Sequence, residues 1–379
     1  MTKSFIPVFR PALPNGPEIA PYIAEIDARR HYTNRGPLVE RLEARLAALF
    51  GHREHAVRTA SSGTSAIEVA ILAHAGAAKA ERPLALIPSF TFAATALAAE
   101  RCGYQPYFLD IEANSWTLDH ERLARHPVLA RAGVILPVAP FGVLPDMRAL
   151  EALQDATGVP VVVDAAAAFE AVVSDQGAIS DRVPLTLSFH ATKSFSSGEG
   201  GAVLWNEPRG QARVMQAANF GFFHSREARV PGTNAKLSEY HAAVGLAMLD
   251  GLAQRQADWL AVAGLWRTHS AGRDLGGRLH LSPRLSSAYV LLEAESPRQM
   301  ERTEAHLYTG LVETRRWYEG GLHVQPHFTA RGRDPMPMTE SLSERLLGLP
   351  MAHDLDEEHI VLILDRIAEA ASTSLRDTA

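Results

Sequence analysis

The chain has little cysteine and no long apolar run. Its 379 residues include a single cysteine, Cys102, which excludes an internal disulfide and a cysteine-based metal site and indicates a reducing compartment. No segment approaches the roughly 20 apolar residues of a membrane span, and residues 1–11 lack the apolar stretch of a signal peptide. We therefore expect a soluble, cytoplasmic protein in which Cys102 is a packing residue.

An excess of positive charge is also absent. The chain carries 37 Lys and Arg against 43 Asp and Glu, a formal net charge of -6, and its cations form no block. The sequence thus lacks the features of a nucleic-acid-binding protein. None of the 16 histidines belongs to a His-Glu-x-x-His pair, so no metal is expected.

Lysine is scarce, which draws attention to Lys193. It lies in the segment 187–203, among small, polar and glycine residues between two apolar runs. A lysine in a tight, partly desolvated turn can become the amine nucleophile that forms a Schiff base with an aldehyde cofactor. The alternative is a solvated loop lysine. His190, three residues earlier, is either a catalytic group or the partner in a hydrogen bond within the turn.

A second segment, 160–169, is an apolar, β-branched run that ends in Asp164 and small residues. This pattern is typical of a buried parallel strand with an acid at its carboxyl end, where open α/β sheets bind ligands. A buried aspartate needs a cationic or hydrogen-bonding partner, and a protonated pyridine nitrogen is suitable. The alternative, compatible with the first, is that Asp164 caps a helix in the alanine-rich stretch that follows.

A third segment, 57–73, runs from a short polar turn into a helix with apolar periodicity. The free N–H groups at the helix start, with the hydroxyls of Ser62, Thr64 and Ser65, make an anion site suited to a phosphate ester. Taken alone, this is an ordinary capped helix. In chain order, the three segments suggest a phosphate cradle, a pyridinium partner and a Schiff-base lysine.

The order of apolar runs predicts an α/β fold. Strand-like runs alternate with helix-like segments, which favours a mainly parallel central sheet flanked by helices. We expect a large cofactor-binding domain over residues 1–250, N-terminal segment included, and a smaller α+β domain over residues 251–379 that begins with a long helix. The strand-like runs are 84–87, 107–109, 134–138, 161–163 and 186–189.

The glycines at 198–201 do not make a dinucleotide-binding loop. They lead into the strand-like run 202–205, whereas such a loop must open a helix. We interpret them as backbone freedom for a hairpin beside Lys193.

These segments together resemble the pyridoxal-phosphate (PLP) sugar aminotransferases of the DegT and StrS type, within the fold-type I aminotransferase superfamily. The resemblance covers nearly the whole chain, and the ordered set is far more specific than any one piece. The matching segments are 32–37, 62–64, 88–95, 106–111, 164–166, 188–193, 219–222 and 234–239.

The resemblance implies individual roles. Lys193 corresponds to the Schiff-base lysine, and Asp164 to the partner of the pyridine nitrogen. Phe92 matches the aromatic residue that stacks on the cofactor ring, for which the alternative is core packing. The family's phosphate-binding positions, the last of them contributed by the neighbouring subunit, are matched by Ser62, Gly63, Thr64, Ser188 and Asn234.

One position departs from the family. Ala167 stands where glutamine or histidine is usual, and alanine has no donor with which to position the cofactor or the acceptor. The substrate-site candidates are His190, Lys236, Arg316, Tyr318 and His323. For the last three, the alternative is an interdomain surface.

The resemblance implies a homodimer with shared active sites that moves an amino group from an amino acid, expected to be glutamate, to a nucleotide-linked keto sugar. Resemblance to the family members that share the form of residues 189–193 implies a 4-keto-6-deoxy sugar and hence deoxyamino-sugar biosynthesis. One alternative is amination of a cyclitol or another ketone in natural-product biosynthesis. The other is a PLP-binding regulatory or scaffold protein without turnover. Ala167 is the only feature that favours this alternative. Relatives that dehydrate sugars replace the lysine, so Lys193 argues against dehydration.

Overall fold

The computed structural model describes residues 5–376, which divide by their contacts into two units. The larger unit comprises Leu13–Asp250 and Leu322–Met336, and the smaller comprises the remaining described residues. The predicted division at residue 250 therefore differs from the structure in two segments. Residues 5–12 group with the smaller unit because Ile6 N–H donates to the Leu311 carbonyl at 2.9 Å. Residues 322–336 return to the larger unit, where they add a strand to its sheet.

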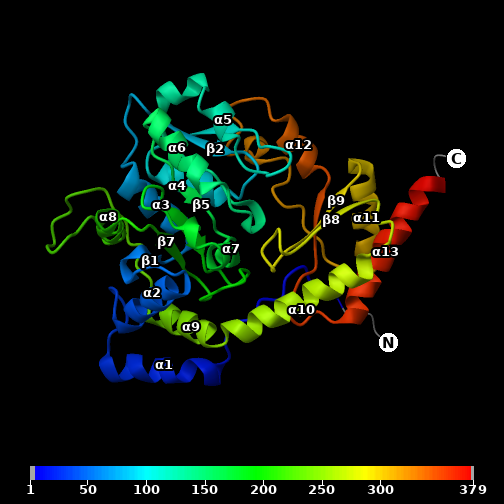
Figure 1. The fold of residues 1–379 in the computed structure, drawn as a ribbon, viewed down its shortest axis with the longest axis horizontal. Coiled ribbons are helices and arrows are strands. Elements are labelled where there is room, and N and C mark those ends of the chain that lie inside the picture. The colour runs from blue at the N-terminus through cyan, green and yellow to red at the C-terminus, as the bar shows by residue number, and fades with distance from the viewer. Residues whose placement is uncertain (1–4, 377–379) are drawn as a thin grey trace. The chain divides into compact units, whose positions relative to one another are not determined.

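A mainly parallel sheet lies at the centre of the larger unit (Figure 1). One set of strands has the order β10-β3-β2-β4 and is parallel throughout. The other has the order β1-β7-β6-β5, in which only β7 runs against its neighbours. Parallel bridges from Ile135 to Val161 and from Val138 to Asp164 join the two sets. The strands are β1 (Val57–Ala60), β2 (Leu84–Pro88), β3 (Gln105–Leu109), β4 (Ala132–Ile135), β5 (Val163–Asp164), β6 (Leu185–Ser188), β7 (Gly201–Leu204) and β10 (Gly332–Arg333).

The predicted α/β class is confirmed. The five apolar runs correspond to β2 through β6, and β2 and β6 are buried at every residue, as expected for strands covered on both faces. The carboxyl ends of β2, β5 and β6 carry Ser89, Asp164 and Ser188. This edge of the sheet is where ligands bind in open α/β folds.

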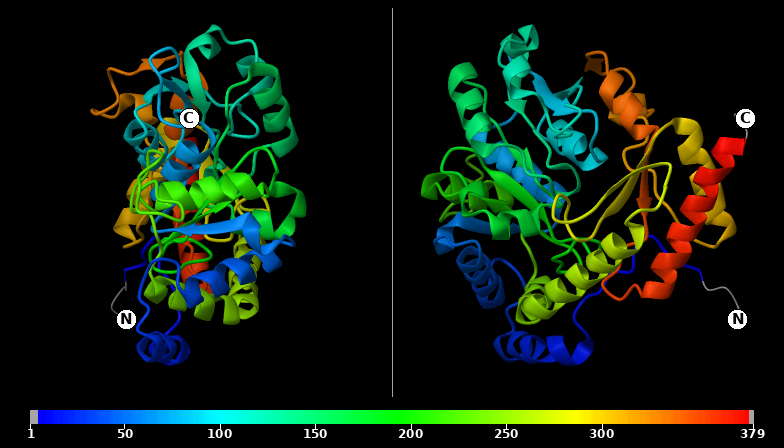
Figure 2. Two further views of the ribbon diagram at one scale, coloured as in Figure 1. Left: turned by 90° about the vertical axis from the view of Figure 1, so that its left-hand side faces the viewer. Right: turned by 45° about the vertical axis from the view of Figure 1, so that its right-hand side comes forward.

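The helices of the larger unit pack on this sheet and on one another. α3 contacts β6, β7, α4 and α8, while α2 contacts β1 and α9. α1 lies against α9 at the bottom of the views in Figures 1 and 2. The helices are α1 (Gly16–Arg29), α2 (Pro37–Leu49), α3 (Gly63–His74), α4 (Ala93–Arg101), α5 (His120–Leu123), α6 (Met147–Thr157), α7 (Phe169–Ser174), α8 (Pro208–Ala218) and α9 (Glu239–Asp250).

The smaller unit has the α+β organisation that the sequence predicts. Its three-stranded antiparallel sheet has the order β11-β9-β8, and the long helix expected after residue 250 is α10. Trp266, Ile363 and Leu364 are fully buried in its core. Its elements are α10 (Leu252–Ser270), β8 (Gly277–His280), β9 (Val290–Ala294), α11 (Pro297–Thr309), α12 (Pro337–Ser343), β11 (Leu346–Leu349) and α13 (Glu357–Arg376). Between residues 5 and 376, every helix is too short or too polar to cross a membrane.

Candidate active site

Asp164 is a buried carboxyl at the end of β5, only 6% exposed. Its Oδ2 accepts from the Thr95 hydroxyl at 2.6 Å, and its Oδ1 accepts from Ala166 N–H at 3.1 Å. Burial raises the pKa of Asp164, while these two hydrogen bonds and the charge of Lys193 act to lower it. The helix-cap alternative is wrong, because the residue that precedes α7 is Ala168.

Lys193 lies in the connection between β6 and β7, which is the predicted hairpin. The backbone N–H of Lys193 donates to the His190 carbonyl at 2.9 Å. The residue is half-buried, unlike a fully solvated loop lysine. Across the hairpin, Ala191 N–H donates to the Gly198 carbonyl at 2.9 Å. Gly198 has a φ of 83°, a conformation that glycine adopts without strain. The hairpin thereby fixes the backbone that carries Lys193.

His190 has a partner within the same turn. Its Nδ1 lies 2.9 Å from the Thr192 hydroxyl and accepts from Thr192 N–H at 3.3 Å. Its Nε2 is 3.9 Å from the Glu199 carboxylate. These contacts account for His190 as a structural residue, and its catalytic role stays a prediction.

The start of α3 is packed against the end of β6. Ser62 caps the helix, since its hydroxyl accepts from Ser65 N–H at 3.1 Å. A Cβ built on Gly63 would lie 2.7 Å from the Ser188 Cβ, so only glycine allows this approach. The N–H groups of Gly63 and Thr64 open the helix and have no acceptor within it. Helix donors and serine hydroxyls therefore converge here, as a phosphate group requires.

Phe92 is an exposed aromatic residue at the start of α4. Its side chain is 66% exposed, so the core-packing alternative is wrong. It directly precedes α4, and its carbonyl is 3.3 Å from the hydroxyl of Thr95, the residue that binds Asp164. An exposed ring at this place is available to cover a flat cofactor.

Ala167 is buried in the turn between β5 and α7. Its exposed fraction is 9%, and Ala168 N–H closes the turn by donating to the Ala165 carbonyl at 2.8 Å. The side chain that the family usually places here is thus absent from the neighbourhood of Asp164.

The chemistry of these donors fits PLP. Asp164 is a buried acid with a raised pKa, and a protonated ring nitrogen would supply the charge partner that burial demands. The first turn of α3, with Ser62 and Ser188, offers donors for a phosphate. Lys193, whose charge acts on Asp164, supplies an amine for an aldehyde.

Asn234 and Lys236 form a pair beside this region. The Lys236 ammonium donates to the Asn234 Oδ1 at 2.5 Å and lies 4.5 Å from the centre of the Phe220 ring. Between the two, the Ala235 carbonyl accepts from the Ser61 N–H at 2.7 Å. This bond holds the segment against the turn between β1 and α3. Burial lowers the pKa of Lys236.

Lys236 also lines a cavity of about 280 Å³ in the larger unit. Arg35 and Arg58 line the same cavity, together with the buried carboxylate of Glu43. Glu43 accepts from Arg35 Nε at 3.0 Å and from Thr59 N–H at 2.9 Å. The cavity therefore carries more positive than negative charge.

The three remaining candidates fall in different units. Arg316 belongs to the smaller unit, where Glu304 accepts from its Nε at 3.0 Å and its Nη2 at 2.6 Å and raises its pKa. Tyr318, also in the smaller unit, has a positive φ of 56°. His323 belongs to the larger unit and is buried, with its Nδ1 2.7 Å from the Ser89 hydroxyl. Their approach to an acceptor stays a prediction.

Sequence reasoning assigned no role to Thr95 or Ser89. Both lie in the segment 88–95, which follows β2 at the ligand-binding edge of the sheet. The cluster of hydroxyl residues after a buried strand could have indicated a functional role. Their partners, Asp164 and His323, are distant in sequence, so the sequence alone could not identify the contacts.

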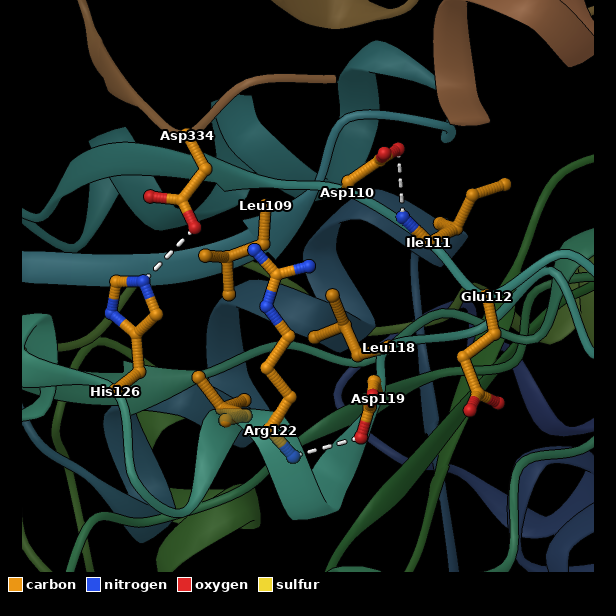
Figure 3. A pocket seen from close by; sticks show the side chains of 10 residues that line it. Leu109, Asp110, Ile111, Glu112, Leu118, Asp119, Arg122, His126 and Asp334 are labelled. Atoms are coloured by element: carbon orange, nitrogen blue, oxygen red, sulfur yellow. Dashed lines mark hydrogen bonds and ion pairs between the residues drawn. The ribbon is translucent and has the colours of Figure 1, made fainter. Parts of the chain in front are cut away.

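A separate pocket of about 130 Å³ lies at the carboxyl end of β3 (Figure 3). Asp334 accepts from the Tyr107 hydroxyl at 2.8 Å and lies 2.9 Å from His126 Nε2. The side chain of Arg122 points into the pocket (Figure 3). None of the predicted site residues lines it, and within residues 5–376 no group of three or more metal-binding side chains is found.

Comparison with known proteins gives the family. Residues 15–368 match the DegT/DnrJ/EryC1/StrS aminotransferase family. Protein Rv3402c of Mycobacterium tuberculosis (strain H37Rv) is 32% identical over 374 residues, which cover 96% of this chain and 90% of that protein. A dTDP-4-amino-4,6-dideoxy-D-glucose transaminase of Escherichia coli is 25% identical, with 96% and 98% covered. The crystal structure of DesI in the presence of its TDP-sugar product matches with a TM-score of 0.86 and 27% identity, covering 99% of this chain and 96% of that one.

The family match extends over both units and nearly the whole chain. It confirms the predicted enzyme class, an aminotransferase, and the predicted cofactor, PLP. The chain therefore belongs to the DegT/DnrJ/EryC1/StrS aminotransferase family of PLP-dependent enzymes.

Proposed function

We propose that this protein transfers an amino group from an amino acid, with glutamate as the expected donor, to a nucleotide-linked 4-keto-6-deoxy sugar. The observation that carries the proposal is the buried Asp164 within the electrostatic reach of Lys193, in the same unit as the phosphate cradle at Gly63 and Ser188. The sugar class is supported by the likeness to DesI and to the E. coli transaminase.

In this proposal, the chain's own residues hold the cofactor and move the proton. PLP, when bound, supplies an electron-poor ring that accepts the electron pair released at the substrate carbon. Asp164 keeps the ring nitrogen positively charged, and Phe92 covers one ring face. Ser62, Gly63, Thr64 and Ser188 hold the phosphate. In each half of the reaction, the Lys193 amine would carry a proton between the substrate carbon and the cofactor carbon.

The acceptor is proposed to meet the remaining candidates. Arg316 carries a permanent cation suited to an anionic nucleotide, and Tyr318 and His323 offer hydrogen-bond groups. His190 and Lys236 complete the set. Burial of Lys236 favours its pairing with an anion, because an ion partner offsets the cost of desolvation.

A homodimer follows from the proposed place of Asn234. As an isologous interface repeats every contact, Asn234 and Lys236 of each subunit would reach the phosphate region of the other. Exposed aromatic residues flank the segment, since Phe220 is 46% and Phe223 is 43% exposed. The proposed assembly would cover this exposed apolar surface, and its exposure in the single chain supports the proposal.

The test of the lysine starts from the purified protein, which should be yellow. Borohydride reduction should fix the cofactor to the peptide that contains Lys193. Lys193→Ala should bind PLP but lose turnover by several orders of magnitude. A reduced adduct on Lys79 or Lys236 would contradict the assignment.

The substrate test pairs the holoenzyme with glutamate and a panel of nucleotide-linked keto sugars, read by mass spectrometry. Amination of a 4-keto-6-deoxy sugar is expected. Turnover of a cyclitol ketone alone would redirect the proposal, and failure to convert the cofactor with any amino donor would favour a regulatory protein.

The shared site is tested by mixing Lys193→Ala with Asn234→Ala subunits. Each hybrid dimer would have one doubly defective site and one intact site, so we expect up to about a quarter of wild-type activity to return, half of the sites in the half of the dimers that are hybrid. Demonstrated subunit exchange without recovery would show that Asn234 serves its own subunit.

A further inference from the structure

A short chain of buried hydroxyl groups ends on Asp164. The Thr91 and Thr95 hydroxyl oxygens are 3.0 Å apart, and the Thr95 hydroxyl donates to Asp164 Oδ2 at 2.6 Å. Thr91 is 2% exposed and Thr95 is fully buried, so water does not compete for these contacts. Thr95 belongs to the first turn of α4, which fixes its position relative to β5.

The direction of each hydrogen bond follows from the number of hydrogens. An ionised carboxylate only accepts, so the single hydroxyl hydrogen of Thr95 is directed at Asp164. The hydrogen between the two threonines must then come from Thr91. The other acceptor near Thr95, the Phe92 carbonyl, is farther away at 3.3 Å. The chain therefore runs from Thr91 through Thr95 to Asp164.

Each carboxylate oxygen thus receives one donor, Oδ2 from Thr95 and Oδ1 from Ala166 N–H. Donors to the charged form oppose the effect of burial, and donors in series strengthen one another. Lys193 is the charged residue that acts on Asp164 among those the structure describes. Each oxygen has a further lone pair, so one can still accept from a ring nitrogen.

We propose that Thr95, supported by Thr91, is a positioning residue that keeps Asp164 ionised and fixes its orientation for pairing with the ring nitrogen of PLP. This inference rests on the proposed role of Asp164. It assigns the hydroxyl of Thr95, as distinct from its methyl group, a part in cofactor binding.

A matched control lies on the neighbouring strand. Thr186 is 1% exposed and is the register partner of Asp164 between β5 and β6. Its hydroxyl donates to the Val163 carbonyl at 3.1 Å and not to Asp164. Thr186→Val therefore removes an equally buried hydroxyl near Asp164 without removing a donor to its carboxylate.

The experiment titrates the Asp164 carboxyl carbon by NMR in the full-length, cofactor-free protein labelled with carbon-13 at aspartate Cγ. The signal that disappears in Asp164→Asn identifies the residue. Thr95→Val should move its titration midpoint up by about one to two pH units, as expected from losing a hydrogen bond to a charged group. Thr95→Ser should restore the midpoint, Thr91→Val should give a smaller upward shift, and Thr186→Val should leave it unchanged.

PLP binding gives the second measurement. Thr95→Val should raise the Kd for PLP about tenfold at neutral pH, and Thr95→Ser should not. A titration midpoint that stays at its wild-type position in Thr95→Val would overturn the inference, and Thr91→Val decides if the first variant does not fold. If Asp164→Asn itself leaves the Kd for PLP unchanged, the proposed role of Asp164 fails, whatever the Thr95 titration shows.

Discussion

At the residue scale, Asp164 lies at the ligand-binding edge of the sheet, but its burial disfavours the charged form of its carboxyl group. It is 6% exposed, and burial is the largest influence on its pKa, which lies above the ordinary value of 3.8. An acid with a raised folded-state pKa stabilises the fold only below its unfolded pKa, and that stability is lost as the pH rises through the folded pKa. At neutral pH, Asp164 therefore destabilises the cofactor-free protein.

This predicts that Asp164→Asn stabilises the cofactor-free protein at pH 7. The amide keeps both contacts, because Thr95 can turn its hydroxyl to accept. We expect a Tm higher by roughly 2–4 °C, which corresponds to about 1 kcal/mol in a large domain, and at least tenfold weaker PLP binding. Calorimetry of the two cofactor-free proteins checks it, with measurements near pH 3.5 as the control, where the Tm difference should shrink. An unchanged or lower Tm at pH 7 would argue that the carboxyl is not destabilising.

Sequence reasoning at this scale found the residues whose chemistry is carried by residue type. Three residues could be identified from their type and their position. Lys193 lies in a turn of small residues, Asp164 ends an apolar strand, and Ser62 precedes a helix. Thr95 has a common side chain, and its proposed role depends on its hydrogen bond to Asp164, which is 69 residues away in the sequence. Such pairings depend on how α4 and β5 pack and are not encoded in local sequence.

At the scale of elements, the contact between the start of α3 and the end of β6 depends on one missing side chain. Gly63 lies so near Ser188 that a Cβ would meet the Ser188 Cβ at 2.7 Å and its Cα at 3.2 Å. Because Ser188 is part of a buried strand, the helix has to move instead. The donors at the start of α3 would then leave their present positions.

Gly63→Ala should therefore weaken PLP binding. The overpacking should cost roughly 1–3 kcal/mol of folding stability, and the displaced donors should raise the Kd for PLP about tenfold, equivalent to about 1.4 kcal/mol of binding free energy, measured by absorbance titration. The matched control is Gly264→Ala in α10, where a Cβ meets nothing within 4 Å. That variant should gain about 0.5–1 kcal/mol of stability and keep the wild-type Kd. Equal affinity in Gly63→Ala would show that α3 can shift without consequence.

The elements themselves were predictable where the apolar runs were continuous, as for β2 through β6. The apolar runs did not predict β1 or β10. Two of the four residues of β1, Arg58 and Thr59, are polar and interrupt an apolar run, and the two-residue β10 exists only because it pairs with β3, more than 200 positions earlier. Phe92 illustrates the opposite case, since composition favours a buried phenylalanine and the fold leaves it 66% exposed.

At the scale of the whole molecule, contacts near both of its ends help to hold the segment 322–336 to the rest of the larger unit. Asp334 accepts from Tyr107 and pairs with His126, and the backbone N–H of Leu322 donates to the Ser89 carbonyl at 2.9 Å. Burial and the bond to Asp334 raise the pKa of Tyr107 to about 12. The stabilisation from Tyr107 is thus present below pH 10 and is lost as the pH rises toward 12.

Asp334→Ala should loosen this segment. We expect a loss of about 1–3 kcal/mol in urea unfolding, because two donors lose their acceptor, and faster proteolysis between residues 322 and 336. Tyr107→Phe, which spares the contact with His126, should cost less and should remove part of the loss of stability between pH 10 and 12. If Asp334→Ala and Tyr107→Phe lose the same free energy of unfolding, the contact between His126 and Asp334 does not help to hold the segment.

The path of the chain between the two units has an evolutionary consequence. The polypeptide passes from one unit to the other four times, after Ala12, Asp250, Gly321 and Met336. No single crossover in the gene can exchange one unit and leave the other whole, and a fragment ending at Asp250 would lose β10 and His323. Exchange of one complete unit between relatives would therefore require a crossover at each of the four passages.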